Sequence, residues 1–173
     1  MNRFALPAAV VALVAVAGLP AETPAEVPAA QQILGTWRLV SYVGEDVGSG
    51  ARTDVMGAHP SGYLEYGRDG RMIVIITGTD RSKPAGPVAT PAEALALLTS
   101  LLAYAGTYTL DTSAHTVTHH IEVSWDETRT GESHVRTYRL EGDRLTLTTA
   151  PSRDPATGKP SVRTVVWEQV RSP

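Results

Sequence analysis

Four residues between positions 115 and 122 carry side chains that could hold a metal ion or move a proton: His115, His119, His120 and Glu122. The segment is rich in β-branched residues, as strands are, and successive side chains in a strand point to opposite faces. His119 therefore points away from His120 and Glu122, and His115 falls in the preceding turn. Two ligands on one strand face are too few for a structural zinc site. The spacing predicts no metal site and leaves His119 on an otherwise apolar wall.

The alternation around His119 also predicts which side chains face the interior. Residues 117, 119, 121, 123 and 125 share one face, which is apolar apart from His119. The same reasoning applied to residues 104–110 and 132–140 gives two further inner faces. A mostly apolar wall with few polar groups suits a pocket that buries an apolar molecule and orients it by hydrogen bonds. The predicted ligand-binding residues are Trp37, Tyr104, Tyr108, His119, Trp125, Arg136 and Tyr138.

Each of these residues also has a purely structural interpretation. Trp37 suits packing at the floor of a core, the tyrosines suit core positions with bonded hydroxyl groups, and His119 suits a hydrogen-bonded core histidine. An inward Arg136 needs an acidic partner such as Glu65, or an anionic ligand, because burying an unpaired charge is unfavourable. If the alternation of its strand is shifted by one residue, Arg136 faces solvent instead.

Sequence motifs of the common enzyme classes are absent. The chain has no Gly-x-Ser-x-Gly elbow, phosphate-binding glycine loop, His-Glu-x-x-His motif or calcium loop. A buried imidazole beside tyrosines and an arginine could still move a proton within an enclosed ligand, so an isomerase or cyclase using His119 is one alternative. A structural or interaction barrel with a filled core is another. No cofactor is predicted.

Short runs of β-branched and aromatic residues alternate with turn residues from residue 33 onward, which is typical of an antiparallel meander. Gly67–Gly70 and Glu141–Asp143 are Gly/Asp links suited to tight hairpins. Eight such strands can close into an up-and-down barrel, which we predict, with a two-sheet sandwich as the competing architecture. The predicted strands are Leu34–Val43, Gly62–Tyr66, Arg71–Thr77, Tyr104–Leu110, Thr116–Trp125, Glu132–Leu140, Arg144–Thr149 and Val162–Val170.

One segment has the pattern of a short amphipathic helix. Thr90 to Glu93 form a capping box with proline at the first helical position, and leucines follow at positions 95, 98, 101 and 102. We expect this helix between the third and fourth strands, with its leucines buried against the barrel. It serves either as a plug or as a moving lid.

The first 30 residues have the composition of an export signal followed by a leader. Asn2 and Arg3 precede an apolar run from Phe4 to Leu19, which is short for a membrane span, and residues 21–32 are rich in Ala, Pro and Glu. We expect a cleaved signal peptide and leader over residues 1–30, one domain over residues 31–173, and a secreted or periplasmic location. A retained hydrophobic anchor is the alternative.

Composition excludes several classes of site and partner. The chain has no cysteine, so it has no disulfide, thiolate metal site or lipid-bearing cysteine. Its net charge of −3 offers no basic surface for nucleic acid, and none is expected as a partner. No stable membrane span is expected after signal cleavage.

Several motifs resemble one family. Gly35-Thr36-Trp37 resembles the Gly-x-Trp opening of the first strand in lipocalins and fatty-acid-binding proteins. Four stretches and the closing Val166–Glu168 are similar to the bacterial and fungal lipocalin-like domain family. The stretches are Gly62–Tyr66, Tyr104–Tyr108, Thr118–Glu122 and Leu140–Leu145. The resemblance implies a calycin-type small barrel but no settled activity. The missing disulfide pair and the position of the helix argue against transferring retinoid or pheromone binding. We therefore expect a binding protein for a small apolar molecule, of unspecified oligomeric state.

Overall fold

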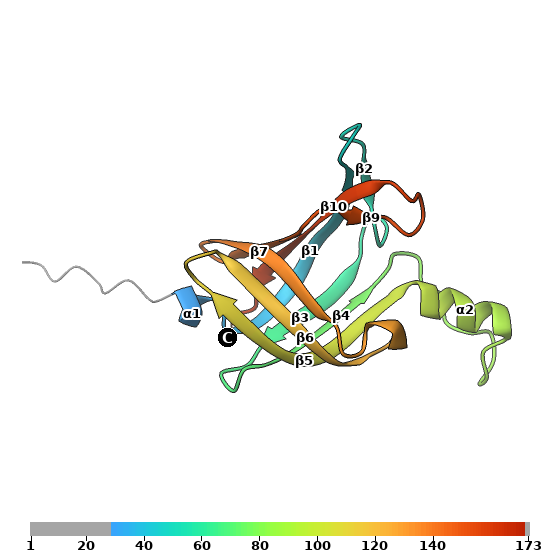
Figure 1. Ribbon diagram of the computed structural model, residues 1–173. Coiled ribbons are helices and arrows are strands. Elements are labelled where there is room, and N and C mark those ends of the chain that lie inside the picture. The colour runs from blue at the N-terminus through green and yellow to red at the C-terminus, as the bar shows by residue number, and fades with distance from the viewer. Residues whose placement is uncertain (1–28, 172–173) are drawn as a thin grey trace, which may run out of the picture.

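The computed structural model describes residues 29–171, shown as the coloured ribbon in Figure 1. The expected signal peptide and leader lie outside the described residues except for Ala29 and Ala30. Between residues 29 and 171, no helix is long and apolar enough to cross a membrane.

The fold is a closed antiparallel β-barrel. Ten strands form one sheet in the order β2-β1-β3-β4-β5-β6-β7-β8-β10-β9, and β1 also pairs with β10 from Trp37 opposite Gln169 to Asp46 opposite Ser161. This second pairing joins the sheet to itself, so eight strands close the barrel while the short β2 and β9 flank the seam. The predicted eight-stranded barrel is confirmed. The strands are β1 (Gly35–Asp46), β2 (Arg52–Asp54), β3 (Ser61–Tyr66), β4 (Arg71–Thr77), β5 (Leu101–Asp111), β6 (Thr116–Ser124), β7 (Ser133–Glu141), β8 (Arg144–Thr149), β9 (Ser152–Arg153) and β10 (Pro160–Gln169).

The two ends of the barrel differ. At one end lies α1 (Ala29–Gln32), together with the tight β3–β4, β5–β6 and β7–β8 hairpins; we call this the packed end. Ile33, Trp37, Leu64 and Leu145 are almost completely buried in the core there. At the opposite, open end lie α2 (Pro91–Thr99), η1 (Glu127–Arg129), β2 and β9 (Figure 1). Any space for a ligand is therefore to be sought at the open end.

Helix α2 differs from its prediction in two respects. Its capping box is present, with Thr90 and Glu93 bonded reciprocally, but the helix follows β4 rather than the third strand, because the short β2 was not anticipated. Of the four predicted helix leucines, Leu95 and Leu98 are not buried but 60% and 48% exposed, and Leu101 and Leu102 belong to β5. Thr77 and Leu101 pair directly, so the helix belongs to an excursion beyond the strand ends and projects away from the barrel (Figure 1). In this position the apolar side of α2 does not pack against the barrel strands (Figure 1).

A β-bulge ends the predicted alternation in β6. Ala105 pairs with Val123 but Gly106 pairs with Ile121, so Glu122 is the extra residue. Val117, His119 and Ile121 point inward as predicted, whereas Val123 is 60% exposed and the prediction for it was wrong. Gly106 permits the bulge, because a Cβ at this position would collide with the backbone oxygen of His120.

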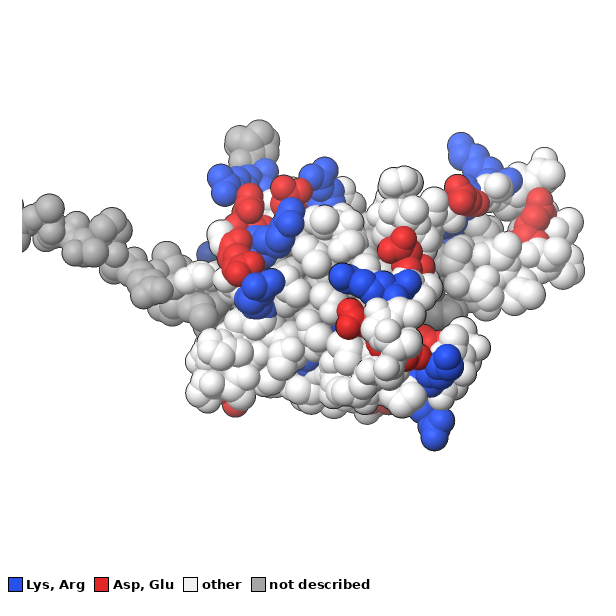
Figure 2. Space-filling model, turned by 90° about the horizontal axis from the view of Figure 1, so that it is seen from above, with Lys and Arg blue, Asp and Glu red and all other residues white. Residues whose placement is uncertain are grey.

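Charged side chains of both signs are intermixed on the face seen in Figure 2. Ion pairs such as Arg38–Glu168, at 2.7 Å, and Arg139–Glu141, at 2.9 Å, bring opposite charges together on the outer surface. On this face no single sign of charge dominates (Figure 2).

Candidate functional site

His119 lies at the centre of a hydrogen-bonded cluster inside the barrel. Its side chain is 1% exposed, and both ring nitrogens have tyrosine partners. Tyr66 Oη from β3 lies 2.6 Å from Nε2, and Tyr104 Oη from β5 lies 2.9 Å from Nδ1. Residues from three strands therefore fix the imidazole in position.

Arg136 determines how the proton is placed on this ring. Its Nη1 lies 3.3 Å from His119 Nδ1 and also donates to the backbone oxygen of His134 at 3.3 Å. A guanidinium can only donate, so this contact favours the tautomer with its proton on Nε2, in which Arg136 and Tyr104 share the single lone pair of Nδ1. His119 then donates to Tyr66 Oη, and Tyr104 donates to Nδ1.

Burial keeps this cluster neutral. Desolvation, followed by the nearby charge of Arg136, lowers the pKa of His119 well below its ordinary value of 6.5. Desolvation also raises the pKa of Tyr66 well above 10 and raises that of Tyr104. The guanidinium of Arg136 is therefore the charged group in direct contact with the cluster.

Arg136 faces inward and is half-buried, as the alternation of β7 predicts. Among the described residues it has no carboxylate within ion-pair distance, and Glu65 is exposed on β3 rather than paired with it. The predicted pairing with Glu65 is thus absent from the described part of the chain. The other partner that the sequence analysis considered for an inward Arg136 is an anionic ligand.

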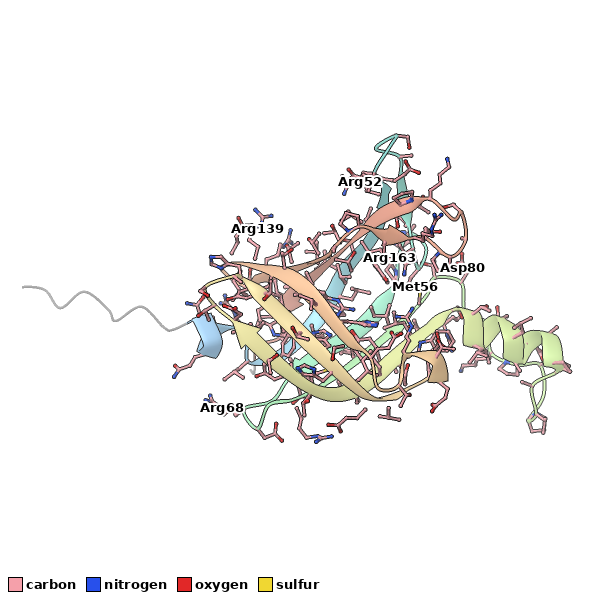
Figure 3. The ribbon with its side chains drawn as sticks, viewed as in Figure 1. Arg52, Met56, Arg68, Asp80, Arg139 and Arg163 are labelled. Atoms are coloured by element: carbon pink, nitrogen blue, oxygen red, sulfur yellow. The ribbon has the colours of Figure 1, made fainter. Side chains whose placement is uncertain are left out.

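The open end of the barrel contains a hollow of about 680 Å³. Arg163 and Met56 lie at this end, while Arg68 and Arg139 lie at the packed end (Figure 3). The walls combine apolar side chains with several arginines. The lining residues used below are Tyr42, Leu102, Arg129, Arg136, Thr149 and Arg163. This mixed lining is more polar than the apolar pocket expected from the sequence.

Of the seven predicted ligand-binding residues, Arg136 lines this hollow. Trp37 is buried and donates from Nε1 to the Ile33 oxygen at 2.8 Å, which is the floor packing considered above. Tyr108 donates to the Gly67 oxygen at 3.0 Å, at the packed end. Trp37 is thus part of the packed core, and a ligand role for it and for the half-buried Tyr108 stays a prediction.

Trp125 and Tyr138 have a different status. Trp125 follows the β6 bulge and is half-buried, and Tyr138 is buried in β7. Trp125 Nε1 and Tyr138 Oη are buried without a hydrogen-bond partner among residues 29–171. A ligand that accepts a hydrogen bond could satisfy either donor. A ligand role stays a prediction for these two residues, and also for Tyr104 and His119.

Arg163 is a candidate site residue that the sequence reasoning did not single out. In β10 it shares a face with the buried Val165 and Trp167, so the alternation of that strand was the available signal. Its Nη2 pairs with Asp154 Oδ2 at 3.4 Å, but its buried Nε has no partner among the described residues. Arg163 thus lies at the open end and has one buried donor that no acceptor in the described part of the chain satisfies.

The outer histidine behaves as the alternation predicts. His120 bonds Thr109 Oγ1 at 3.1 Å and Ser133 Oγ at 2.9 Å on the outside of β6, opposite His119. Across residues 29–171, no group of three or more metal-ligating side chains comes together.

A closed antiparallel barrel, packed at one end and hollow at the other, defines the small calycin-type class to which the sequence motifs pointed. The chain belongs to the lipocalin-like domain family, whose sequence pattern matches residues 34–170. A search of curated proteins finds no match to this chain.

Proposed function

We propose that this chain is an exported protein that binds a small molecule with an apolar body in the open end of its barrel. The observation that carries the proposal is the hollow of about 680 Å³ at that end, which lies within the 300–1,000 Å³ range typical of ligand pockets. Its walls include Tyr42 and Leu102 beside arginine side chains, a combination suited to an apolar body with a polar group. The signal-like composition of residues 2–19 supports a role outside the cytoplasm.

The packing of the barrel limits where the ligand lies. The packed end is filled by Trp37, Leu64, Leu145 and Trp167, each at most 2% exposed. A barrel filled along its whole length would favour the structural role, but at the open end the buried Tyr42 borders the hollow. We therefore expect the ligand to bind above the His119 cluster rather than along the full length of the barrel.

The enzymatic alternative requires a nitrogen of His119 to reach a substrate. Both nitrogens bond tyrosine hydroxyls and the ring is 1% exposed, so the arrangement favours a fixed core residue over a proton shuttle. For this reason we propose binding and not isomerisation.

The proposal is tested by blocking the hollow. Leu102 is half-buried in its wall, so Leu102→Trp should fill part of it and remove ligand seen by native mass spectrometry of protein from its own host. The matched control, Leu98→Trp on the projecting α2, should leave ligand bound. Repeated recovery of wild-type protein without ligand, or equal occupancy in both variants, would contradict the proposal.

A further inference from the structure

We propose that Arg136 and Arg163 form a recognition site for the carboxylate of an amphipathic acid, with Thr149 between them. The inference rests on the proposed function and deepens it by naming the chemical class of the ligand. It follows from three observations about the strands at the open end.

The first observation is register. Arg136 of β7 pairs with Thr149 of β8, and the backbone N–H of Arg163 in β10 donates to Thr149 Oγ1 at 3.0 Å. Neighbouring strands lie about 4.8 Å apart, so the two arginine backbones are about 10 Å apart across β8. All three residues line the same hollow. Their side chains therefore border one space from adjacent strands.

The second observation is the pattern of ion pairs around that space. Arg129 pairs with Asp126 at 3.3 Å, and Glu132 bonds His134 at 2.7 Å, so both rim carboxylates already have partners. Arg136 has no carboxylate partner in the described part of the chain. A half-buried guanidinium in this situation has incomplete compensation for its lost hydration, which a bound anion would supply.

The third observation is the free donor on Arg163. Its Nη2 is held by Asp154, which fixes the guanidinium, while its buried Nε has no acceptor among residues 29–171. A carboxylate has two oxygens, so one can accept from Arg136 and the other from the Arg163 guanidinium, whose side chain is 20% exposed and lines the hollow. Asp154 pairs with Arg163, and Arg153 and Glu132, which also line the hollow, carry opposite charges. The net positive charge around Arg136 is therefore about one. This matches a carboxylate better than a phosphate monoester, which carries −1.5 to −2 at neutral pH.

The experiment compares ligands that differ in the head group alone. Dodecanoic acid, dodecanol, dodecanamide and dodecyl phosphate are titrated into the purified mature protein by isothermal titration calorimetry at fixed salt. We expect the acid to bind at least about tenfold more tightly than the alcohol and the amide, because charge-assisted hydrogen bonds are the stronger ones. Tighter binding of the phosphate than of the acid would overturn the carboxylate assignment.

Variants then locate the effect. Arg136→Gln and Arg163→Gln should each weaken binding of the acid by about tenfold. Each should change the affinity for the alcohol by less than about threefold. Arg139→Gln is the matched control, because Arg139 lies on the same strand as Arg136 but outside the barrel, paired with Glu141. An equal loss in Arg139→Gln would overturn the inference.

The outcomes distinguish failure of the arginine site from failure of the proposed small-molecule binding. Equal affinity for acid, alcohol and amide leaves small-molecule binding intact and overturns the arginine site. No binding of any dodecyl probe overturns the proposed apolar-body ligand, and the inference with it. If Arg136→Gln does not fold, Arg163→Gln and the head-group comparison on the wild-type protein still decide the question.

Discussion

Tyr66 and His119 meet inside the barrel, with 2.6 Å between Tyr66 Oη and His119 Nε2, although β4 and β5 separate their strands in the sheet. The bond spans the interior rather than following the ladder between neighbouring strands. It is possible because the sheet closes, which brings the inner faces of β3 and β6 towards each other. The cluster around His119 is therefore a consequence of closure and a sensitive reporter of it.

Removing the acceptor at this bond should destabilise the barrel. Tyr66→Phe leaves the Nε2–H of His119 buried without a partner, and we expect a loss of about 1–3 kcal/mol in the free energy of unfolding. Urea denaturation followed by tryptophan fluorescence measures the loss. Tyr63→Phe, three residues away and 52% exposed, is the control and should change stability by less than about 0.5 kcal/mol. Equal losses in the two variants would show that the Tyr66–His119 bond is unimportant.

The depressed pKa of His119 predicts a pH dependence of stability. In the unfolded chain the imidazole protonates near its ordinary pKa of about 6.5, whereas in the folded barrel it stays neutral to lower pH. The unfolded state then binds more protons, so the free energy of unfolding falls as pH decreases from about 6.5 towards the lowered folded pKa. The slope contributed by His119 is at most about 1.4 kcal/mol per pH unit.

Variants isolate this slope. His119→Gln should remove it between about pH 5 and 6.5, a range in which carboxylates with lowered pKa values, such as Asp46, contribute little. His120→Gln should retain it, because His119 is intact in that variant. Chemical denaturation at several pH values gives the measurement, and an unchanged slope in His119→Gln would refute the assignment.

The projecting helix α2 should contribute little to global stability. Leu95 is 60% exposed, so Leu95→Ala should change the free energy of unfolding by less than about 0.5 kcal/mol. Leu145→Ala provides the comparison, because Leu145 is fully buried and its truncation should cost about 2–5 kcal/mol. A large loss in Leu95→Ala would mean that α2 packs against the barrel or a partner in solution.

The bulge in β6 depends on Gly106. A Cβ there would collide with the His120 backbone oxygen, so Gly106→Ala should force β5 and β6 apart at a cost of about 1–3 kcal/mol. Gly48→Ala is the control, because a Cβ at Gly48 would meet its nearest atom at an ordinary 3.5 Å. Thermal denaturation followed by circular dichroism distinguishes the two. A neutral Gly106→Ala would show that the strands accommodate the methyl group.

The local pattern of the sequence was enough to predict most of the barrel strands and the direction of their side chains. Period-two alternation and turn chemistry depend on neighbouring residues, so the strands, the inward His119 and the outward His120 follow from the sequence. The same reasoning placed Arg136 inside the barrel. The capping box of α2 is equally local and was correctly predicted.

The tertiary structure alone decided which inward residues pack and which border space. The bulge that turns Val123 outward depends on the close approach of β5 and β6, and the exposure of α2 depends on where β4 and β5 end. The join of β1 to β10 closes the barrel, and the direct β8–β10 pairing places Arg163 beside Thr149, opposite Arg136. Alternation states which face a side chain occupies, but register and closure determine what stands opposite it.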